Sequence, residues 1–193
     1  LSLHDALPIY MVKEMDAGDV IDVVKVPITS TDNVGTMFDK LSLAGRDLLL
    51  ATLPKIVAGN ISPVKQAIDD VTFSPNIPHD KQNLNFEVET AKQLDWHVRG
   101  LYPTHPAYVQ VAGQRIKITQ VQPLDETTTQ PAGYVVEKNK KELKIAAANH
   151  TVLRVLRLQP AGKSEMPIQA YLNGAGKAYV VGQPWAEKIK NER

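Results

Sequence analysis

The sequence predicts two structural regions, the tail of an α/β layer followed by a mostly β, OB-like barrel domain. The first region is indicated by residues 20–28, where apolar side chains occupy both faces of a predicted strand. Helical spacing of apolar residues then follows over residues 34–57. The second region is indicated by a change of period, because apolar and polar residues alternate beyond residue 107, as is typical of β-strands.

The first region is predicted as strand end, turn, strand and helix. Residues 10–15 end one strand, residues 16–19 form a turn, and residues 20–28 form the next strand. Thr31 or Asp32 can supply the N-cap side chain of the helix that follows. This pattern is expected where an α/β layer ends and its earlier strands are absent.

The helix of the first region contains two residues that oppose helical structure. Gly45 and Pro54 are expected to weaken or kink it, since glycine is flexible and proline lacks the backbone donor. Gly59 is expected to end it, because glycine adopts the left-handed conformation found after helices.

Residues 1–9 look foreign to the rest of the chain. They lack the positive start and the cleavage site of a signal peptide. They resemble the peptide obtained by translating a common short-read sequencing adapter. We interpret them as an assembly artefact joined to a chain that begins partway through a gene, so His4 and Asp5 should carry no function. A natural leader is the alternative.

The second region is preceded by a predicted linker and one helix. Residues 61–86 lose periodicity and collect proline and asparagine, which indicates an extended linker. Apolar residues recur at helical spacing over 91–101. Five short strands are expected at residues 107–111, 115–121, 133–138, 142–147 and 151–158. Five strands after one helix are compatible with an OB-like barrel. The expected divisions are 1–9 (artefact), 10–60, 61–86 (linker) and 87–193.

Residues 158–174 are the most distinctive stretch of the chain. Pro160 and Gly162 predict a tight turn after the last strand, with Lys163 exposed at the corner. Pro167 suits the first turn of a short helix and Gly174 suits its end. The stretch is therefore expected to close the domain as turn and short helix.

Composition excludes several classes of site. The 193 residues include no cysteine, which excludes disulfides, thiolate catalysis and thiolate metal ligands. No apolar run approaches the length of a membrane span. The histidines lack paired spacing, so a zinc site is not expected, and we predict no metal at His4, His79, His97, His105 or His150.

Charge divides the chain into an acidic and a basic half. Residues 98–193 contain 14 lysines and arginines against 7 acidic residues, whereas residues 1–97 contain 8 against 14. A basic half joined to an acidic half suggests that the second half faces a polyanion. Two differently charged solvated surfaces are the alternative.

The motifs of the chain resemble the methionyl-tRNA formyltransferase family, in the right order from residue 10 to about 185. Residues 158–163 with 171–174 (Leu-Gln-Pro-Ala-Gly-Lys and Tyr-Leu-Asn-Gly) are similar to the C-terminal signature of that family. Residues 10–19 resemble its active-site segment with an Asp-x-Gly-Asp turn, and residues 73–77 resemble its linker. Residues 99–103 are similar to the helix exit that opens its second domain.

This resemblance implies the tail of a Rossmann-like formyltransferase domain before the OB-like barrel. The implied reaction is formyl transfer from formyltetrahydrofolate, as co-substrate, to the amine of methionyl initiator tRNA in translation initiation. In the family an Asn, a His and an Asp manage the amine proton and the oxyanion. Asp16 matches that Asp, expected to orient and charge the His, and Asp19 matches the second, structural acid. Lys13, Glu14 and Met15 would border the folate.

The resemblance also implies that the Asn and His partners lie upstream of this sequence. We therefore expect the chain to be a fragment that is inactive alone. The implied protein is a cytoplasmic enzyme without a membrane segment, and we expect a monomer.

Several basic residues are candidate contacts to tRNA phosphates, because they are charged and expected to be exposed. They are Arg115, Lys117, Lys138, Lys140, Lys141, Arg154, Arg157 and Lys163. Arg154 and Arg157 are three apart on one strand, so we expect them to face opposite ways. Each candidate has the alternative of an ordinary solvated charge.

Two other functions are also compatible with the sequence. One is a different folate-dependent formyltransferase, acting on an amino sugar or in an aldehyde-releasing system. The other is a non-enzymatic RNA-binding module with an OB-like barrel. The basic second half and the Leu-Gln-Pro-Ala-Gly-Lys run favour tRNA over the first alternative.

Overall fold

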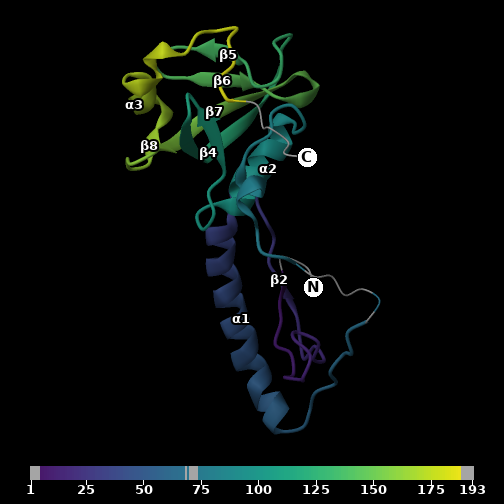
Figure 1. The fold of residues 1–193 in the computed structure, drawn as a ribbon. Coiled ribbons are helices and arrows are strands. Elements are labelled where there is room, and N and C mark those ends of the chain that lie inside the picture. The colour runs from purple at the N-terminus through teal and green to yellow at the C-terminus, as the bar shows by residue number, and fades with distance from the viewer. Residues whose placement is uncertain (1–4, 68, 70–73, 188–193) are drawn as a thin grey trace. The chain divides into compact units, whose positions relative to one another are not determined.

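The computed structural model describes residues 5–67, 69 and 74–187. The chain divides into two compact units, Leu1–Asn76 and Ile77–Arg193 (Figure 1). Among the described residues, no helix has both the length and the apolar character that crossing a membrane requires.

The first unit contains one long helix and a minimal sheet. Strands β1 (Asp5–Ala6) and β2 (Val24–Lys25) pair antiparallel, with Asp5 opposite Lys25. Helix α1 (Val34–Val57) continues through Pro54, and the chain turns away at Gly59, whose φ of 70° is the left-handed conformation. The helix predicted from apolar spacing is confirmed.

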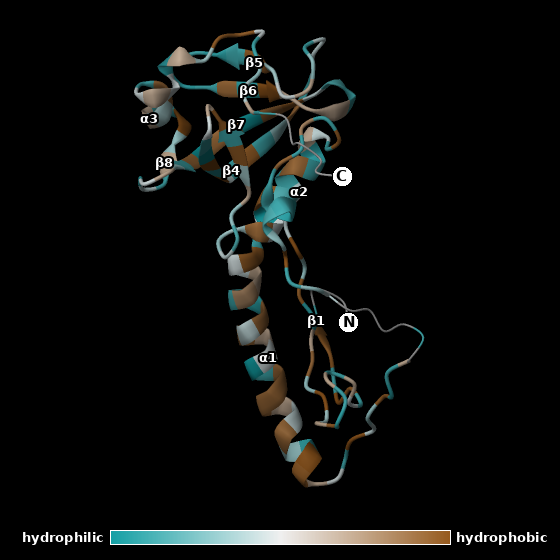
Figure 2. Cartoon of the chain, viewed as in Figure 1, coloured by the Kyte–Doolittle hydropathy of each residue, from teal (hydrophilic) through white to brown (hydrophobic). Residues whose placement is uncertain are grey.

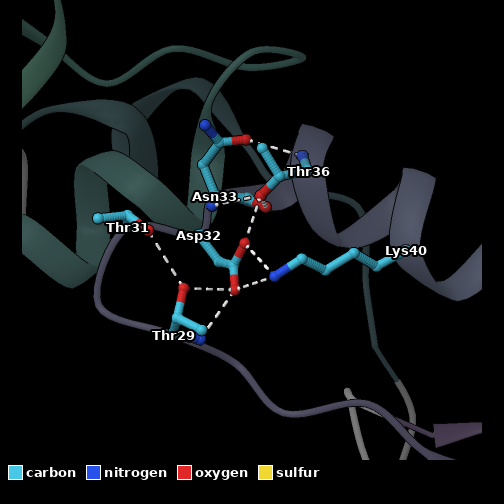
Figure 3. A network of polar contacts seen from close by, with 6 residues as sticks. All are labelled: Thr29, Thr31, Asp32, Asn33, Thr36 and Lys40. Carbon is cyan, nitrogen blue, oxygen red and sulfur yellow. Dashed lines mark hydrogen bonds and ion pairs between the residues drawn. The ribbon is translucent and has the colours of Figure 1, made fainter.

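The start of α1 is fixed by a network of polar side chains (Figure 3). Asn33 is the N-cap, since its side chain accepts the Thr36 N–H at 3.0 Å while the Thr36 hydroxyl accepts the Asn33 N–H. Asp32 instead accepts from Thr29, Thr36 and the Lys40 ammonium, the last at 2.7 Å. The prediction of Thr31 or Asp32 as N-cap was wrong by one or two residues, because Asp32 anchors the network from behind the cap.

The predicted α/β tail of a Rossmann-like domain is wrong. Only Val24–Lys25 of the expected strand 20–28 forms a ladder, and Val23 and Ile28 are 43% and 53% exposed. Of α1, only Met37 and Thr52 are buried, and apolar residues lie on several sides of the helix (Figure 2). A layer with two covered faces needs several paired strands, whereas the described residues of this unit provide one two-residue ladder and isolated bridges from Val20 to Ile9 and Val64.

The second unit is built on a six-stranded antiparallel sheet. Its strands are β3 (Tyr108–Val111), β4 (Gln114–Thr127), β5 (Val135–Lys138), β6 (Leu143–Ala146), β7 (Thr151–Pro160) and β8 (Met166–Pro167). The order is β3-β4-β7-β6-β5, and β8 pairs with the end of β7. The five strands expected from period-two alternation are confirmed, although β4 extends to residue 127.

The predicted OB-like barrel is not found. The pairing path begins at β3 and ends at β5, and among the described residues no pairing joins these two strands. Alternation along each strand predicts which face is buried, but it does not determine whether the outer strands meet. The unit is therefore described as a sheet.

Helix α2 (Ala91–Leu101) packs against β4 and β7. Thr90 and Gln93 form a capping box at its start, and its apolar face, predicted from the sequence, is buried. The core beneath it also takes residues from every long strand and from α3 (Ile168–Leu172). Its fully buried members include Leu94, Val98, Ile118, Leu143, Ile145, Leu153, Val155 and Leu158.

Short turns of 3-10 helix in the second unit include η2 (His79–Gln82), η3 (Ala148–His150) and η4 (Ala175–Ala178). The turn and short helix expected over residues 158–174 are present: Gly162 has a φ of 70°, and α3 starts after Pro167. The segment after η4 returns to the core, where the Trp185 ring packs edge-on against Phe86 and Tyr179.

His97 of α2 ties the preceding segment to the helix. Its Nδ1 lies 2.8 Å from Glu89 Oε1, and its Nε2 lies 2.7 Å from the Lys81 carbonyl oxygen. Both partners are acceptors, so both ring nitrogens must donate, which favours the imidazolium. The hydrogen bond with Glu89 accordingly raises the pKa of His97. Burial opposes ionisation of Glu89, but bonds from His97 and the Asn85 N–H keep its pKa lowered.

The stability of the second unit should therefore depend on pH through His97. A raised folded-state pKa gives a contribution that is complete below about pH 6.5 and is lost as pH rises through the folded value. Replacing His97→Gln should lower the free energy of unfolding by about 1 kcal/mol at acidic pH, with a smaller loss at alkaline pH. Urea unfolding followed by tryptophan fluorescence measures this, because Trp96 and Trp185 both belong to this unit. An equal loss at both pH values would contradict the assignment.

Candidate nucleic-acid interface

Three connections of the sheet lie at one end of it. Antiparallel pairing places Ile116 opposite Pro160 and Leu143 opposite Val155. The starts of β4 and β6 and the ends of β5 and β7 therefore share one end, together with the connections at 112–113, 139–142 and 161–165. Strand β8 and helix α3 also lie there (Figure 1). We call this the basic end, because it collects most of the predicted phosphate contacts.

The first group of cations at the basic end lies at the start of β4 and in the turn after β7. Arg115 and Lys117 are exposed, and the Arg115 guanidinium lies 4.1 Å from the centre of the Tyr108 ring. Lys117 is opposite Gln159, whose side chain donates to the Lys163 carbonyl oxygen at 2.9 Å. The Lys163 side chain itself is exposed. The three cations predicted from the sequence are thus neighbours in the fold.

The second group belongs to the β5–β6 hairpin. Lys140 and Lys141 are exposed at its tip, and the Lys138 ammonium donates to the Lys177 carbonyl oxygen at 2.9 Å. This bond brings the exposed Lys177 of η4 beside the hairpin. The sequence did not indicate Lys177 as a phosphate contact, because it lies 36 or more residues from the lysines of the hairpin. A single basic residue in a glycine-containing segment does not by itself predict a binding site.

Arg154 and Arg157 face the same side of the sheet, contrary to the prediction. Gln120 and Gln122 lie two apart on β4 and are paired with Arg157 and Arg154 respectively. Residues paired across a ladder share a face. Between the pairs Gln120–Arg157 and Val121–Val155, strand β7 contains one extra residue, Leu156. This β-bulge places both arginines on the same face of the sheet. Spacing alone could not reveal this bulge.

Both arginines form ion pairs with glutamates, and the pair of Arg157 is also a hydrogen bond. Arg154 Nε lies 2.8 Å from Glu142 Oε1, and Arg157 Nε lies 2.5 Å from Glu165 Oε1. Glu165 also accepts the Tyr102 hydroxyl at 3.1 Å, and the Arg157 bond is the main reason that its pKa is lowered. Unlike the surface lysines, these arginines can reach a phosphate only in competition with a neighbouring carboxylate.

Lys144, which was not among the predicted contacts, shares this face but is neutralised. It lies opposite Arg154 and pairs with Glu137 at 3.0 Å and with Glu126 at 3.1 Å. Hydrogen bonding to these two carboxylates raises its pKa. Glu126 is near the far end of β4, where Asp125 adds a second acid. Positive charge is therefore concentrated at one end of the sheet.

The predicted catalytic acid lies on an exposed loop of the first unit. Asp16 has a φ of 56°, and its carbonyl oxygen accepts the Gln66 side chain at 2.8 Å. Its carboxylate makes no hydrogen bond or ion pair with another residue of the described part of the chain. Lys13, Glu14 and Met15, the predicted folate-bordering residues, are all exposed. Among the described residues, no side chain is therefore bonded to the Asp16 carboxylate as a second catalytic group would be.

Gly18 allows this loop to close. Gln66 also donates to the Gly18 carbonyl at 2.7 Å, and the Tyr10 N–H donates to the Asp19 carbonyl at 3.1 Å. A Cβ atom on Gly18 would lie 1.7 Å from the Tyr10 carbonyl oxygen, so only glycine fits here.

Replacing Gly18→Ala should therefore displace the loop that carries Asp16. Backbone must move to relieve the clash, and we expect a loss of about 1–3 kcal/mol in the stability of the first unit. Hydrogen exchange of the amides at Tyr10 and Val20 measures the change. Gly100→Ala is a matched control, because nothing lies within 4 Å of a Cβ there. Unchanged exchange at Tyr10 would contradict the packing described.

No group of three or more metal-ligating side chains occurs within the ranges that the structure describes.

Comparison with known proteins gives the family. A family model described as "Formyl transferase, C-terminal domain" matches residues 76–176, slightly more than half of the chain. The chain belongs to the formyl transferase family. The match covers the sheet, α2 and α3, so this formyl transferase C-terminal domain carries the basic end apart from Lys177, which follows the matched range.

Curated relatives are consistent with the resemblance found in the sequence. A methionyl-tRNA formyltransferase from Lactiplantibacillus plantarum is 52% identical over 176 residues, covering 91% of this formyl transferase chain and 56% of the relative. One from Pediococcus pentosaceus is 49% identical over 184 residues, covering 95% and 57%. The chain thus spans about half the length of the curated relatives it matches.

Solved structures show the fold of this formyl transferase family member at low identity. HypX from Aquifex aeolicus in complex with tetrahydrofolic acid has a TM-score of 0.65 at 16% identity, covering 94% of this chain and 32% of HypX. An N-formyltransferase from Helicobacter canadensis, in complex with folinic acid and dTDP-3-aminofucose, has a TM-score of 0.58 at 16% identity. It covers 78% of this chain and 53% of that protein.

Proposed function

We propose that the chain is part of a methionyl-tRNA formyltransferase and that its second unit binds the initiator methionyl-tRNA through the basic end. The observation that carries this proposal is the convergence of three connections at one end of the sheet, where exposed cations gather. A structured RNA presents a dense array of phosphates, and lysines and arginines that neutralise them supply most of the sequence-independent affinity. The identity of about 50% to named relatives supports tRNA as the particular RNA.

The proposed reaction of the whole protein is transfer of a formyl group from formyltetrahydrofolate to the methionyl amine. The amine attacks the formyl carbon, a tetrahedral oxyanion forms, and the tetrahydrofolate nitrogen leaves. A positioned acid or base must manage the amine proton. Asp16 is the proposed carboxylate of that machinery, and Lys13, Glu14 and Met15 are the proposed border of the folate. The carboxylate is exposed and available for a further group.

Residues of the described chain supply Asp16 with no proton partner, so we expect the 193-residue chain to lack formylation activity by itself. We further propose that it is monomeric and cytoplasmic, as a translation enzyme of this kind would be. The sugar formyltransferase alternative has weaker support, since similar solved structures of that type share only 16% identity and indicate the fold alone.

Binding of initiator tRNA by the full chain tests the proposal. Anisotropy of fluorescently labelled tRNA should show affinity that falls steeply between 50 and 200 mM salt, by about 10-fold or more if several phosphates are contacted. Met-tRNA formylation assayed in parallel should give no turnover. Absence of binding at low salt, or affinity unchanged by salt, would contradict the proposed interface. Turnover by this chain alone would contradict the proposed incompleteness of the active site.

A further inference from the structure

A groove in the second unit lies between β7, the β5–β6 hairpin and the start of α3. Its volume is about 400 Å³, and it is shallow and broadly open to solvent. Lys141 and Glu142 line it from the hairpin, Arg154 and Leu156 from β7, and Pro167 and Gln169 from the segment that enters α3. This volume is within the range of about 300–1,000 Å³ typical of small-molecule sites.

One side of the groove is suited to an anion. The Lys141 ammonium is exposed and has no hydrogen-bond or ion-pair partner in the described part of the chain. The Arg154 side chain is 35% exposed and lies on the same outward face. A guanidinium can bind a phosphate through two parallel hydrogen bonds, and a lysine beside it adds a second charge.

The other side of the groove is apolar with one amide. Leu156 is the bulged residue of β7, and the bulge leaves it half-buried on an otherwise polar face. Pro167 is exposed beside it, since β8 places Pro167 opposite Arg157. Gln169 is exposed and offers both a donor and an acceptor. A nucleobase, which has flat apolar faces and polar edges, can contact both the apolar side chains and the amide.

Glu142 controls the availability of Arg154. Its carboxylate lies 2.8 Å from Arg154 Nε, and its side chain is 24% exposed. The carboxylate lies at the Nε edge of the guanidinium, and its negative charge weakens the attraction of Arg154 for an incoming phosphate. Glu142 thus reduces the affinity of the groove for small anions and favours a ligand that also contacts the apolar side.

We propose that this groove accommodates one unstacked nucleotide of a bound RNA, with its phosphate at Lys141 and Arg154 and its base against Leu156 and Pro167. The inference rests on the proposed function for its RNA, but it concerns a subsite that shares Lys141 with the basic end and otherwise has its own residues. Contacts to unstacked bases are the usual means by which proteins distinguish single-stranded RNA from a duplex. The groove would therefore read a loop or an end of the RNA, while the lysines of the basic end contact phosphates generally.

Adenosine monophosphate is the probe for the test, added to the full ¹⁵N-labelled chain. Its addition should shift the amide signals of Lys141, Glu142, Leu156 and Gln169. Inorganic phosphate at the same concentration should shift them less, because it lacks the base. Equal shifts with phosphate would overturn the nucleotide site in favour of a general anion site. Shifts with a glutamate-rich peptide but none with the nucleotide would overturn it in favour of a protein partner.

Two variants make the test specific. Lys141→Gln should weaken adenosine monophosphate binding about two- to fivefold, whereas Lys81→Gln, an exposed lysine remote in sequence, should not. Glu142→Gln should strengthen binding about two- to fivefold, because it frees Arg154. Weaker binding by Glu142→Gln, with its unbound spectrum otherwise preserved, would overturn the role assigned to Glu142. Normal binding of initiator tRNA without any groove shift would overturn this inference and leave the proposed function intact.

Discussion

Replacement of Lys140, Lys141 and Lys163 together by glutamine is expected to weaken initiator tRNA binding by about 10- to 500-fold at low salt. These lysines are exposed at two connections of the basic end, and glutamine keeps most of the side chain while removing the charge. Each lost phosphate contact lowers the slope of log affinity against log salt by about 0.9, so the slope should fall by up to about 2.7. Anisotropy of labelled tRNA over a salt series measures both quantities.

A matched triple variant controls for net charge. Lys55, Lys65 and Lys81 are also exposed, and their replacement by glutamine removes the same number of charges. This control should keep the wild-type slope and lose affinity only slightly. Equal effects of the two triple variants would mean that tRNA responds to overall charge, and the basic end would then have no special role.

Replacing Asp16→Asn should abolish most formylation activity in a protein that contains a complete active site. A suitable protein is a chimera that adds to this chain the residues of the Lactiplantibacillus plantarum relative outside the matched region. Asparagine keeps the shape of the side chain but cannot carry the negative charge that stabilises a protonated partner, so turnover should fall about 10²–10⁴-fold. Affinity for initiator tRNA should stay within about twofold, because Asp16 belongs to the other unit.

Asp19→Asn in the same chimera is the control. Asp19 holds the loop through its main-chain carbonyl, which accepts the Tyr10 N–H, and the substitution preserves that bond. Turnover should remain within about tenfold of the parent. Retention of activity by Asp16→Asn, or its loss in Asp19→Asn alone, would reassign the acid.

Local patterns predicted most of the second unit. Local sequence patterns predicted the period-two strands, the α2 helix with its buried face, and the turn at Gly162. Each of these features is determined by residues close to one another in the sequence. The predictions that failed concern how separate strands pair and pack. Whether β3 meets β5 depends on sheet curvature, and whether residues 20–28 are buried depends on strands that pair with them. For this reason the predicted α/β tail was wrong and the predicted barrel was not confirmed.

The residues of the basic end were also predicted only in part. Charge and exposure identified the lysines of the basic end, because a basic residue in a turn next to glycine or asparagine is seldom buried. Pairing could not be predicted: Arg154 and Arg157 are held by Glu142 and Glu165, and a bulge turns them to one face. Lys177 joins the hairpin only through the fold.

Lysine acetylation, measured by mass spectrometry on the full chain with and without initiator tRNA, tests the central claim most directly. Bound RNA should protect the exposed lysines of the basic end, which are Lys117, Lys140, Lys141, Lys163 and Lys177. Lys55, Lys65 and Lys81 should react equally in both samples. Protection of these three lysines, with unchanged reactivity at the basic end, would contradict the account.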